Sequence, residues 1–378
     1  MADNGDSGSA ESGGDDIARH RAAIDALDDA ILARLSERAQ HAHAIGMIKG
    51  TGAAYRPERE AQVLARMAAA NPGPLPDDAV TGVFRQIMSA CLALERRLAI
   101  GYLGPAGTFS HAAVHRHFGD FVDAMPYASI DEVFRAAESG QVDYAVVPVE
   151  NSTEGAVGRT LDLIAQTPLA ICGEAKLRVQ QHLMTRAPAL AGIGRVYSHA
   201  QSLAQCTRWL ARNLPQASRV PVASNAEAAR LAGAEDGAAA IAGENAAAIH
   251  AVPILVRNIE DEPNNTTRFW VLGHHAAGAS GHDQTSVVIA CPNKPGALVA
   301  VLEPFARHGV SMSRVESRPS RVELWEYLFF VDVAGHSGDA PVAAALADLR
   351  AIAPHVKLLG SYPAPLAPSA ASTPSKAR

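Results

Sequence analysis

The residues best placed for chemistry follow an apolar run at positions 144–149. The run reads YAVVPV, which is typical of a buried strand. In open α/β sheets, small ligands bind in the crevice beyond the carboxyl ends of the strands. Hydroxyl, amide and carboxylate groups at such a place can hold a small polar molecule through hydrogen bonds. The polar residues that follow the run are Glu150, Asn151, Ser152, Thr153 and Glu154.

Three other segments bring polar residues to a strand end or a helix start. They are GYLGPAGTFSHAAV (101–114), VYSHAQSLAQC (196–206) and PNNTTRFWVLG (263–273). The free N–H groups at helix starts suit an anionic ligand. Each segment alone is explained more simply by helix capping, but four such exits together favour a cleft that binds a carboxylate. The candidates that these segments add are Thr108, Ser110, Ser198, Gln205, Asn265, Thr267 and Arg268.

A second set of candidates lies on predicted helices and begins with two cations on an apolar face. Apolar residues recur at helical spacing from Ile24 to Ile45, and Arg38 and Lys49 fall on the same face. Cations within a burying stripe are costly unless something anionic meets them. The alternative is that these charges reach water or pair with acidic neighbours. The helices that follow add Arg59, Glu60, Cys91 and Glu95.

Arg21 lies on the same predicted helix but too far away to join Arg38 at one ligand. The two arginines are 17 residues apart in the sequence. At helical rise this is roughly 25 Å along the axis. If Arg21 works at such a site, that site belongs to another subunit.

Composition restricts the class of protein. A chain of 378 residues is too long for one typical core, and its 48% hydrophobic and 19% charged residues are ordinary for a soluble globular enzyme. A net charge of -6 gives no reason to expect nucleic acid or a membrane as a partner. Four scattered cysteines form no CxxC pair, and no apolar run approaches the ~20 residues of a membrane span. The acidic, Gly/Ser-rich start does not resemble a signal peptide, so we expect a cytoplasmic protein.

The pattern changes along the chain and predicts several domains. Helical patterns alone fill residues 16–98, whereas residues 99–273 alternate apolar runs and helical stretches, as in an α/β domain with a mostly parallel sheet. Residues 285–362 follow the ferredoxin-like order βαββαβ. The remaining pieces are interpreted as a disordered tail at 1–15, a linker at 274–284 and a second disordered tail at 363–378.

Neither a nicotinamide cofactor nor a metal is expected. The stretch at 101–107 reads GxxGxxG instead of GxGxxG, and no acidic partner follows about 20 residues later. His111, His115 and His117 include a helical i,i+4 pair, but no carboxylate or cysteine completes a ligand set. These histidines are therefore interpreted as a solvated helix face.

Residues 16–98 resemble the all-helical chorismate mutase domain of bacterial aromatic-amino-acid enzymes. The resemblance rests on RAAIDALDDAILARLSERA, IGMIKG, YRPERE and FRQIMSACLALE. In that family three helices from each of two chains intertwine, and each pocket borrows an arginine from the partner. The resemblance implies that Arg38 and the partner's Arg21 hold the carboxylates of chorismate, while Lys49 faces the breaking ether oxygen. It also implies that Arg59 supports the carboxylate end and that Glu60 binds the hydroxyl.

Two positions depart from the pattern best known for that fold. Cys91 stands where a serine can occur, and Glu95 where a glutamine can donate to the ether oxygen. A carboxylate donates only when it is protonated. We therefore expect mutase activity to fall as Glu95 ionises with rising pH, and Glu95→Gln to flatten that profile.

The segments GPAGTFS, VPVENSTEGAVG, YSHAQSLAQC and NNTTRFWVLG together resemble prephenate dehydratase. The resemblance implies two α/β lobes with a cleft between them, one formed by 101–178 and about 252–273 and the other by 179–251. It makes Thr267 the group that helps protonate the leaving hydroxyl, with Glu150 or His199 as its polarising neighbour. Arg268 either contacts a carboxylate or anchors its strand, and Phe269 packs beside the ring. The residues implied to hold substrate are Asn151, Ser152, Thr153, Ser198, Gln205, Thr108, Ser110 and Asn265.

The stretch NKPGALVAVLEPFARHGVSMSRVESRPSR (293–321) resembles the ACT regulatory domain of prephenate dehydratases. The resemblance implies a phenylalanine site between paired domains. A glycine at a helix start lets the backbone approach a ligand, and free N–H groups there suit a carboxylate. The alternative is a small domain that only holds a dimer together. The implied effector residues are Asn293, Gly296, Ala297, Leu298, Glu316, Ser317 and Arg318.

Together the resemblances imply a cofactor-free bifunctional chorismate mutase–prephenate dehydratase that phenylalanine inhibits, assembled as a homodimer or a dimer of dimers. One alternative is a dehydratase whose mutase part serves only dimerisation. Another is a non-catalytic amino-acid sensor. The cationic helical stripe and the polar exit that carries Thr267 argue against a sensor. A mutase part that serves only dimerisation is disfavoured because all of its implied site residues are present, namely Arg21, Arg38, Lys49, Arg59 and Glu60.

Overall fold

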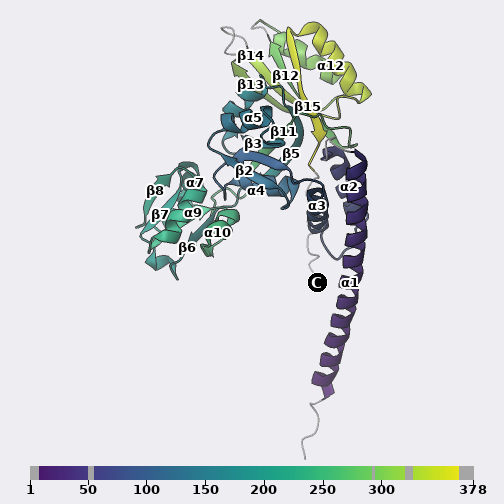
Figure 1. Ribbon diagram of the computed structural model, residues 1–378. Helices are drawn as coiled ribbons and strands as arrows, with labels where there is room; N and C mark the ends of the chain where they lie inside the picture. The colour runs from purple at the N-terminus through teal and green to yellow at the C-terminus, as the bar shows by residue number, and fades with distance from the viewer. Residues whose placement is uncertain (1–7, 50–54, 292–293, 320–326, 366–378) are drawn as a thin grey trace, which may run out of the picture.

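The structure is a computed structural model that describes residues 8–49, 55–291, 294–319 and 327–365, with the side chains of α1 described from residue 14 to 48. A long helix extends away from the body of the molecule, which consists of a helical domain, two α/β lobes and a C-terminal α+β domain (Figure 1). No helix within these ranges is long and apolar enough to cross a membrane.

The helical domain consists of α1 (Gly8–Lys49), α2 (Pro57–Ala69) and α3 (Asp77–Ala93). Proline at its first position suits the start of α2, because the missing N–H has no partner there in any helix. The helix α1 begins within the segment 1–15 that was expected to be disordered. Its predicted apolar stripe faces outward, since Ile24, Leu27 and Ile31 are 54%, 62% and 55% exposed. No element of the described chain packs over this stripe.

The first lobe contains a sheet in the order β2-β1-β3-β11-β5, with the short β4 beside β3. The strands β1, β2 and β3 are parallel, as predicted, but β11 runs antiparallel to both β3 and β5. Because β3 and β5 are both antiparallel to β11, the strands β2, β1, β3 and β5 run in one direction, and β11 is inserted between β3 and β5 against them. The chain returns from the second lobe to form β11. The elements are β1 (Ala99–Leu103), α4 (Phe109–Phe118), β2 (Asp123–Tyr127), α5 (Ile130–Glu138), β3 (Tyr144–Asn151), β4 (Gly155–Ala156), α6 (Gly158–Ile164), β5 (Ala170–Arg178) and β11 (Thr266–Gly273).

The second lobe has its own sheet in the order β10-β6-β9-β7-β8. Its strand β9 is fully buried and reads AAAIA, so small side chains let α9 pack closely on the sheet. The elements are β6 (His182–Thr185), η1 (Leu190–Gly192), β7 (Arg195–His199), α7 (Ala200–Gln205), α8 (Thr207–Asn213), β8 (Ser218–Val222), α9 (Asn225–Ala234), β9 (Ala238–Ala242), α10 (Glu244–His250) and β10 (Ile254–Val256).

The C-terminal domain confirms the predicted βαββαβ order. Its antiparallel sheet runs β13-β14-β12-β15. The elements are β12 (Asp283–Cys291), α11 (Ala297–Arg307), β13 (Met312–Pro319), β14 (Tyr327–Ala334), α12 (Ala340–Ile352) and β15 (His355–Pro363).

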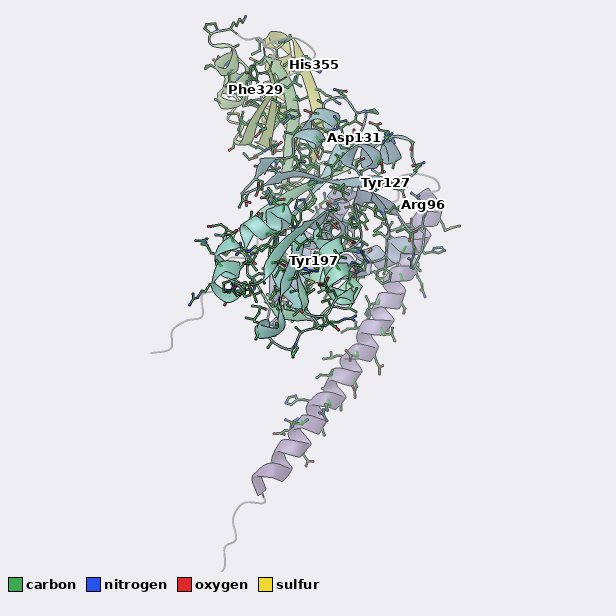
Figure 2. All side chains as sticks on the ribbon, turned by 90° about the vertical axis from the view of Figure 1, so that its left-hand side faces the viewer. Arg96, Tyr127, Asp131, Tyr197, Phe329 and His355 are labelled. Atoms are coloured by element: carbon green, nitrogen blue, oxygen red, sulfur yellow. The ribbon has the colours of Figure 1, made fainter. Side chains whose placement is uncertain are left out.

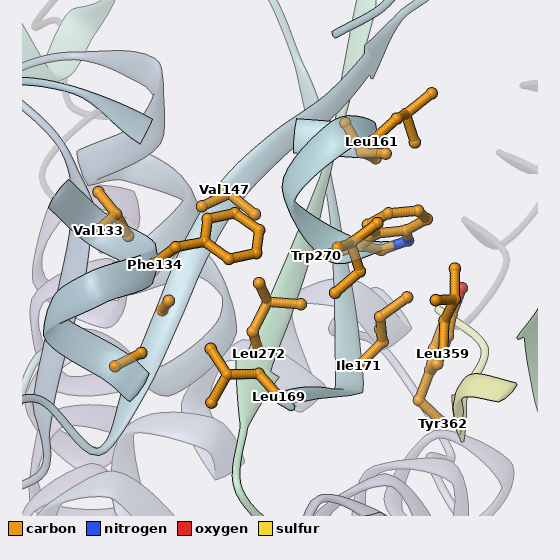
Figure 3. Close-up of a cluster of buried hydrophobic side chains, with 14 of the residues drawn as sticks. Val133, Phe134, Val147, Leu161, Leu169, Ile171, Trp270, Leu272, Leu359 and Tyr362 are labelled. Carbon is orange, nitrogen blue, oxygen red and sulfur yellow. The ribbon is translucent and has the colours of Figure 1, made fainter. Parts of the chain in front are cut away.

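The C-terminal domain shares a hydrophobic core with the first lobe. Figure 3 shows Trp270 and Ile171 of the lobe beside Leu359 and Tyr362 of β15, and all four are at most 1% exposed. At Gly360 the backbones approach so closely that a Cβ would overlap the carbonyl oxygen of Ile171. The two sheets therefore form one packed unit.

The helical domain also docks on the first lobe. Tyr55 is 6% exposed, contacts the rings of Phe118 and Tyr144, and its hydroxyl lies 3.0 Å from Nε2 of His117. Arg96, which is labelled in Figure 2, donates to both carboxylate oxygens of Asp143, at 2.7 and 3.0 Å.

Residues 274–284, interpreted as a linker, lie against the first lobe. His274 Nε2 is 2.8 Å from the carbonyl oxygen of Ala137, and Ala277 is buried. The segment thereby joins the two packed domains through specific contacts.

Candidate functional site

The ends of β3 and β11 bring three of the predicted polar residues together. The strand register pairs Thr267 with Asn151. The Asn151 amide donates to the Thr267 hydroxyl oxygen at 2.9 Å and to Oδ1 of Asn265 at 2.7 Å. No described acceptor takes the hydrogen of the Thr267 hydroxyl. Its oxygen is therefore fixed as an acceptor, while its hydrogen can be given to a ligand.

The turn after β3 is built around the carbonyl oxygen of the Asn151 side chain. This oxygen accepts from the Thr153 N–H at 3.0 Å, the Thr153 hydroxyl at 2.6 Å and the Glu154 N–H at 3.1 Å. The Ser152 hydroxyl accepts from the Thr266 N–H at 3.0 Å. Asparagine commonly organises such turns through its own side chain. The turn and β11 are thus tied into one unit.

Strand alternation directs the neighbouring residues to the opposite side of the sheet. Glu150 binds Arg268 at 3.0 Å and Arg314 at 3.0 Å, so its carboxylate faces the C-terminal domain and not the Thr267 hydroxyl. This geometry argues against Glu150 as the direct polarising neighbour of Thr267.

Arg268 is held inside the protein. It binds Glu174 at 2.6 Å and Asp332 at 3.0 Å. Burial lowers the pKa of Arg268, but pairing with Glu174 and Asp332 raises it above its usual value overall. Of the two roles left open for Arg268, the geometry favours the strand anchor.

Phe269 was expected beside the substrate ring, and the structure differs. Its side chain is 1% exposed and belongs to the core cluster of Tyr102, Val146 and Val271. A β-bulge between Arg268 and Phe269 separates it from the exposed end of the strand. It supports the strand from within the core.

The second lobe contributes a separate polar network. Ser198 is fully buried, with its hydroxyl 2.7 Å from the Ile241 carbonyl and 3.0 Å from Oδ1 of Asn225. Asn225 donates to the Ser202 hydroxyl at 2.9 Å. His199 is exposed, and its ring nitrogen accepts from the backbone of the helix α7. Ser198 therefore orders the lobe, and its hydroxyl is already occupied.

Sequence reasoning missed two members of this network. Asn225 opens α9 directly after β8, so the same exit rule that selected other candidates applies to it. Gln181 donates to Ser202 at 2.9 Å and to Gln205 at 3.3 Å, and it is 1% exposed. No local pattern marks Gln181, because its partners lie more than 20 residues away.

A cavity of about 370 Å³ lies between the lobes and is lined by both of them. It brings Gln205 near the turn and strand end that carry Thr153 and Asn265. Arg208, on the same wall, is paired with Glu262 at 2.9 Å. The lining residues are Thr153, Glu154, Ala204, Gln205, Arg208, Glu260, Asp261, Glu262 and Asn265.

The turn before α4 also reaches the second lobe. Thr108 caps α4 by accepting from the His111 N–H at 3.3 Å, while Ser110 is buried. The His111 ring nitrogen Nδ1 lies 3.2 Å from both the Gly107 N–H and the Asn245 amide of α10. Burial, and secondarily His115, lowers the pKa of His111 to about 4, so it is neutral near pH 7. The histidines thus order a lobe junction and are not merely a solvated face.

The helical domain brings some of its predicted residues together. Arg38 donates to the Cys91 sulfur at 3.0 Å, and Glu95 lies against Gly46 of α1. Glu95 is exposed in the single chain. Arg21 and Arg59 are exposed as well, and the Lys49 side chain lies outside the described residues.

Glu60 has a partner that the sequence did not indicate. Arg85 of α3 lies 3.5 Å from its carboxylate. Burial raises the pKa of Glu60 to about 7, against the lowering effect of Arg85. Arg85 is therefore a further candidate residue beside Glu60.

The predicted effector residues fall into two groups. Gly296 adopts φ 78° at the start of α11, where Ala297 is buried and Leu298 is 39% exposed. On β13, Ser317 is exposed, whereas Glu316 and Arg318 are half-buried. Arg318 was expected to meet the effector, but it binds Asp162 of the dehydratase lobe at 2.9 Å. Asn293 lies outside the described residues.

Comparison with known proteins agrees with this architecture. The chain matches the families described as chorismate mutase type II (residues 20–96), prephenate dehydratase (100–277) and ACT domain (285–351). The bifunctional chorismate mutase/prephenate dehydratase of Neisseria gonorrhoeae is 55% identical over 91% of this chain and 96% of that protein. The protein of the same description from Pseudomonas aeruginosa is 46% identical over 92% and 98%.

A solved structure shares the fold of a large part of the chain. The prephenate dehydratase of Arthrobacter aurescens, in complex with L-Phe, is 36% identical over 71% of this chain and 90% of that chain, with a TM-score of 0.65. The helical domain corresponds to the chorismate mutase match at residues 20–96. The chain belongs to the family of bifunctional chorismate mutase/prephenate dehydratases that carry a C-terminal ACT domain.

Proposed function

We propose that the chain rearranges chorismate to prephenate and then converts prephenate to phenylpyruvate, with phenylalanine as its feedback inhibitor. Family membership supports both activities. The observation that carries the dehydratase site is the hydrogen bond from Asn151 to Thr267, beside a cavity between two lobes.

In the dehydratase reaction the bond between the ring and its carboxylate breaks and releases carbon dioxide. The electron pair of that bond moves into the ring, and the hydroxyl on the opposite carbon leaves as water after it receives a proton. Aromatisation drives the reaction, so the protein must orient the dianion and assist the leaving group. No oxidant or reductant is needed.

Thr267 assists the departure of the hydroxyl. Because its oxygen already accepts from Asn151, its hydrogen is directed away from Asn151 towards the substrate. A threonine hydroxyl is a weak acid, so its hydrogen bond strengthens as negative charge develops on the leaving oxygen. Solvent supplies the proton that the hydroxyl takes up when it leaves as water. The neighbouring amides and hydroxyls of Asn265, Thr153 and Gln205 orient the substrate.

In the mutase reaction the protein forms no covalent bond to the substrate. It holds chorismate in a compact conformation and places fixed cations where negative charge gathers on the ether oxygen. Lys49 is the cation that faces the ether oxygen, whereas Arg38 and Arg21 of a second subunit hold the carboxylates. The exposed apolar stripe of α1 supports such a dimer, because burial against a second copy would cover Ile24, Leu27 and Ile31.

Phenylalanine is proposed to bind to the C-terminal domain near Gly296 and Ser317. The ACT match and the complex of a related dehydratase with L-Phe support this. Leu298 is exposed beside the start of α11 and offers apolar surface for the ring.

One assay tests the proposed function directly. The purified chain, freed of ions and nucleotides, is given chorismate, and phenylpyruvate is followed by its absorbance in alkali. We expect phenylpyruvate to form without any cofactor, and added phenylalanine to slow it. If the chain consumes neither chorismate nor prephenate, the proposal is wrong.

A further inference from the structure

The C-terminal domain touches the dehydratase lobe directly behind the candidate site. Arg314 of β13 lies 3.0 Å from the Glu150 carboxylate, and Asp332 of β14 lies 3.0 Å from Arg268. Glu150 immediately precedes Asn151, and Arg268 immediately follows Thr267. Both residues of the candidate catalytic pair are therefore one position away from a contact with the C-terminal domain.

These contacts belong to a charge cluster of three carboxylates and three cations with a buried centre, while Glu150 and Lys176 at its edge are 32% and 49% exposed. Its carboxylates are Glu150, Glu174 and Asp332, and its cations are Arg268, Arg314 and Lys176. The side chains of Glu174, Asp332 and Arg314 are 0%, 1% and 7% exposed. Removing one member of such a cluster leaves an uncompensated buried charge, which is strongly unfavourable.

The cluster can fix the orientation of the catalytic pair through the two strands. The register pairs Arg268 with Glu150 and Thr267 with Asn151. Successive side chains alternate between the faces of a sheet, so one pair faces the cluster while the next faces the site. A shift of Arg268 or Glu150 therefore rotates or displaces Thr267 or Asn151.

The segment after the turn is held by the same domain. Arg318 of β13 binds Asp162 of α6 at 2.9 Å. Lys357 of β15 donates to the carbonyl oxygens of Ile164, Ala165 and Thr167 at 3.0, 3.1 and 2.6 Å. Residues 150–167, which include the turn after β3 that carries Thr153, thus contact the C-terminal domain at three places.

We propose that Arg314 and Asp332 are positioning residues of the dehydratase: the C-terminal domain completes the charge cluster that orients Asn151 and Thr267. The inference rests on the proposed dehydratase function. It gives the regulatory domain a part in the uninhibited reaction, in addition to any response to an effector. Neither residue contacts the candidate catalytic groups directly, so each acts through Glu150 or Arg268.

The test compares Arg314→Gln with Arg307→Gln in the full chain. Arg307 is the matched control, because it is an arginine of the same domain that also forms ion pairs, but its partners Glu303 and Asp348 are in that domain and it lies on the exposed surface of α11. We expect Arg314→Gln to lower the dehydratase kcat about 3- to 30-fold without phenylalanine, with a smaller change in KM. The control should retain the wild-type kcat. The mutase activity of the same preparation reports whether the chain is folded and should not change.

A double-mutant cycle shows whether Arg314 acts through Glu150. If it does, Arg314→Gln has little further effect on kcat in the Glu150→Gln background. Arg314→Lys, which keeps the charge, should restore part of the rate. Equal dehydratase kcat in Arg314→Gln and Arg307→Gln would overturn the inference, as would a parallel loss of both activities. A wild-type chain that does not turn over prephenate would instead refute the proposed function.

Discussion

The side-chain amide of Asn151 donates to the hydroxyl oxygen of Thr267 across 2.9 Å, between strands whose sequence positions are 116 residues apart. The bond assigns the two atoms different roles. The nitrogen of Asn151 supplies the fixed hydrogen, and the hydroxyl of Thr267 keeps its own hydrogen for another acceptor. A leaving hydroxyl placed against Thr267 would be that acceptor.

Replacing Thr267 with alanine should remove this donor. We expect Thr267→Ala to lower the dehydratase rate by roughly 10²–10⁴, the usual range for a lost proton-transfer group. Mutase activity should be unchanged, so prephenate should accumulate from chorismate. The matched control is Thr266→Ala, because Thr266 meets Ser152 through its backbone N–H. Near-normal prephenate turnover by Thr267→Ala would remove this residue from the mechanism.

Asn151→Asp tests the direction of the hydrogen bond with almost no change of shape. An ionised aspartate has no hydrogen to donate, so the Thr267 hydroxyl would turn and donate to it. The hydrogen needed by the leaving group would then be occupied. We expect the dehydratase kcat to fall by at least about tenfold, within the range for a lost proton-transfer or oxyanion donor. If kcat for prephenate stays at the wild-type value in this variant, the assigned direction is wrong.

Glu60 should set a pH limit on the mutase reaction. Burial raises the pKa of Glu60 to about 7, while Arg85 opposes the shift. If Glu60 accepts the substrate hydroxyl as a carboxylate, protonation weakens that contact. The kcat/KM for chorismate should therefore fall as pH drops through about 7, since this parameter follows the free enzyme.

Two variants separate the contributions to that profile. Glu60→Gln cannot ionise, so the acid limb should disappear. Arg85→Gln removes the cation that stabilises the carboxylate, so the pKa of Glu60 should rise and the limb should move to higher pH. An acid limb that persists in Glu60→Gln belongs to another group.

The fold followed from local patterns, but the direction of key side chains did not. Helical spacing and strand exits identified the domains and the segments that carry Asn151 and Thr267. Whether Arg268 faces substrate or protein depends on Asp332, which is 64 residues away in a different domain. The local sequence pattern does not indicate which face of a strand will be covered by a domain that comes later in the chain. Gln181 was missed for a different reason, because its partners Ser202 and Gln205 lie more than 20 residues away in the same lobe. Phe269 was placed beside the substrate because strand alternation does not reveal the register shift between Arg268 and Phe269.

The partner contribution of Arg21 can be tested by mixing two inactive variants. Arg21→Ala and Arg38→Ala should each lose mutase activity as homodimers, because each pocket needs Arg38 from one chain and Arg21 from the other. In a mixed dimer one pocket lacks both arginines and the other contains both. After unfolding and refolding at equal amounts, about a quarter of the wild-type mutase activity should return, given random pairing in a two-fold dimer.

The 54% to 62% exposure of Ile24, Leu27 and Ile31 gives the physical reason to expect pairing along α1. A mixture that stays as inactive as its components would place Arg21 outside the partner's pocket.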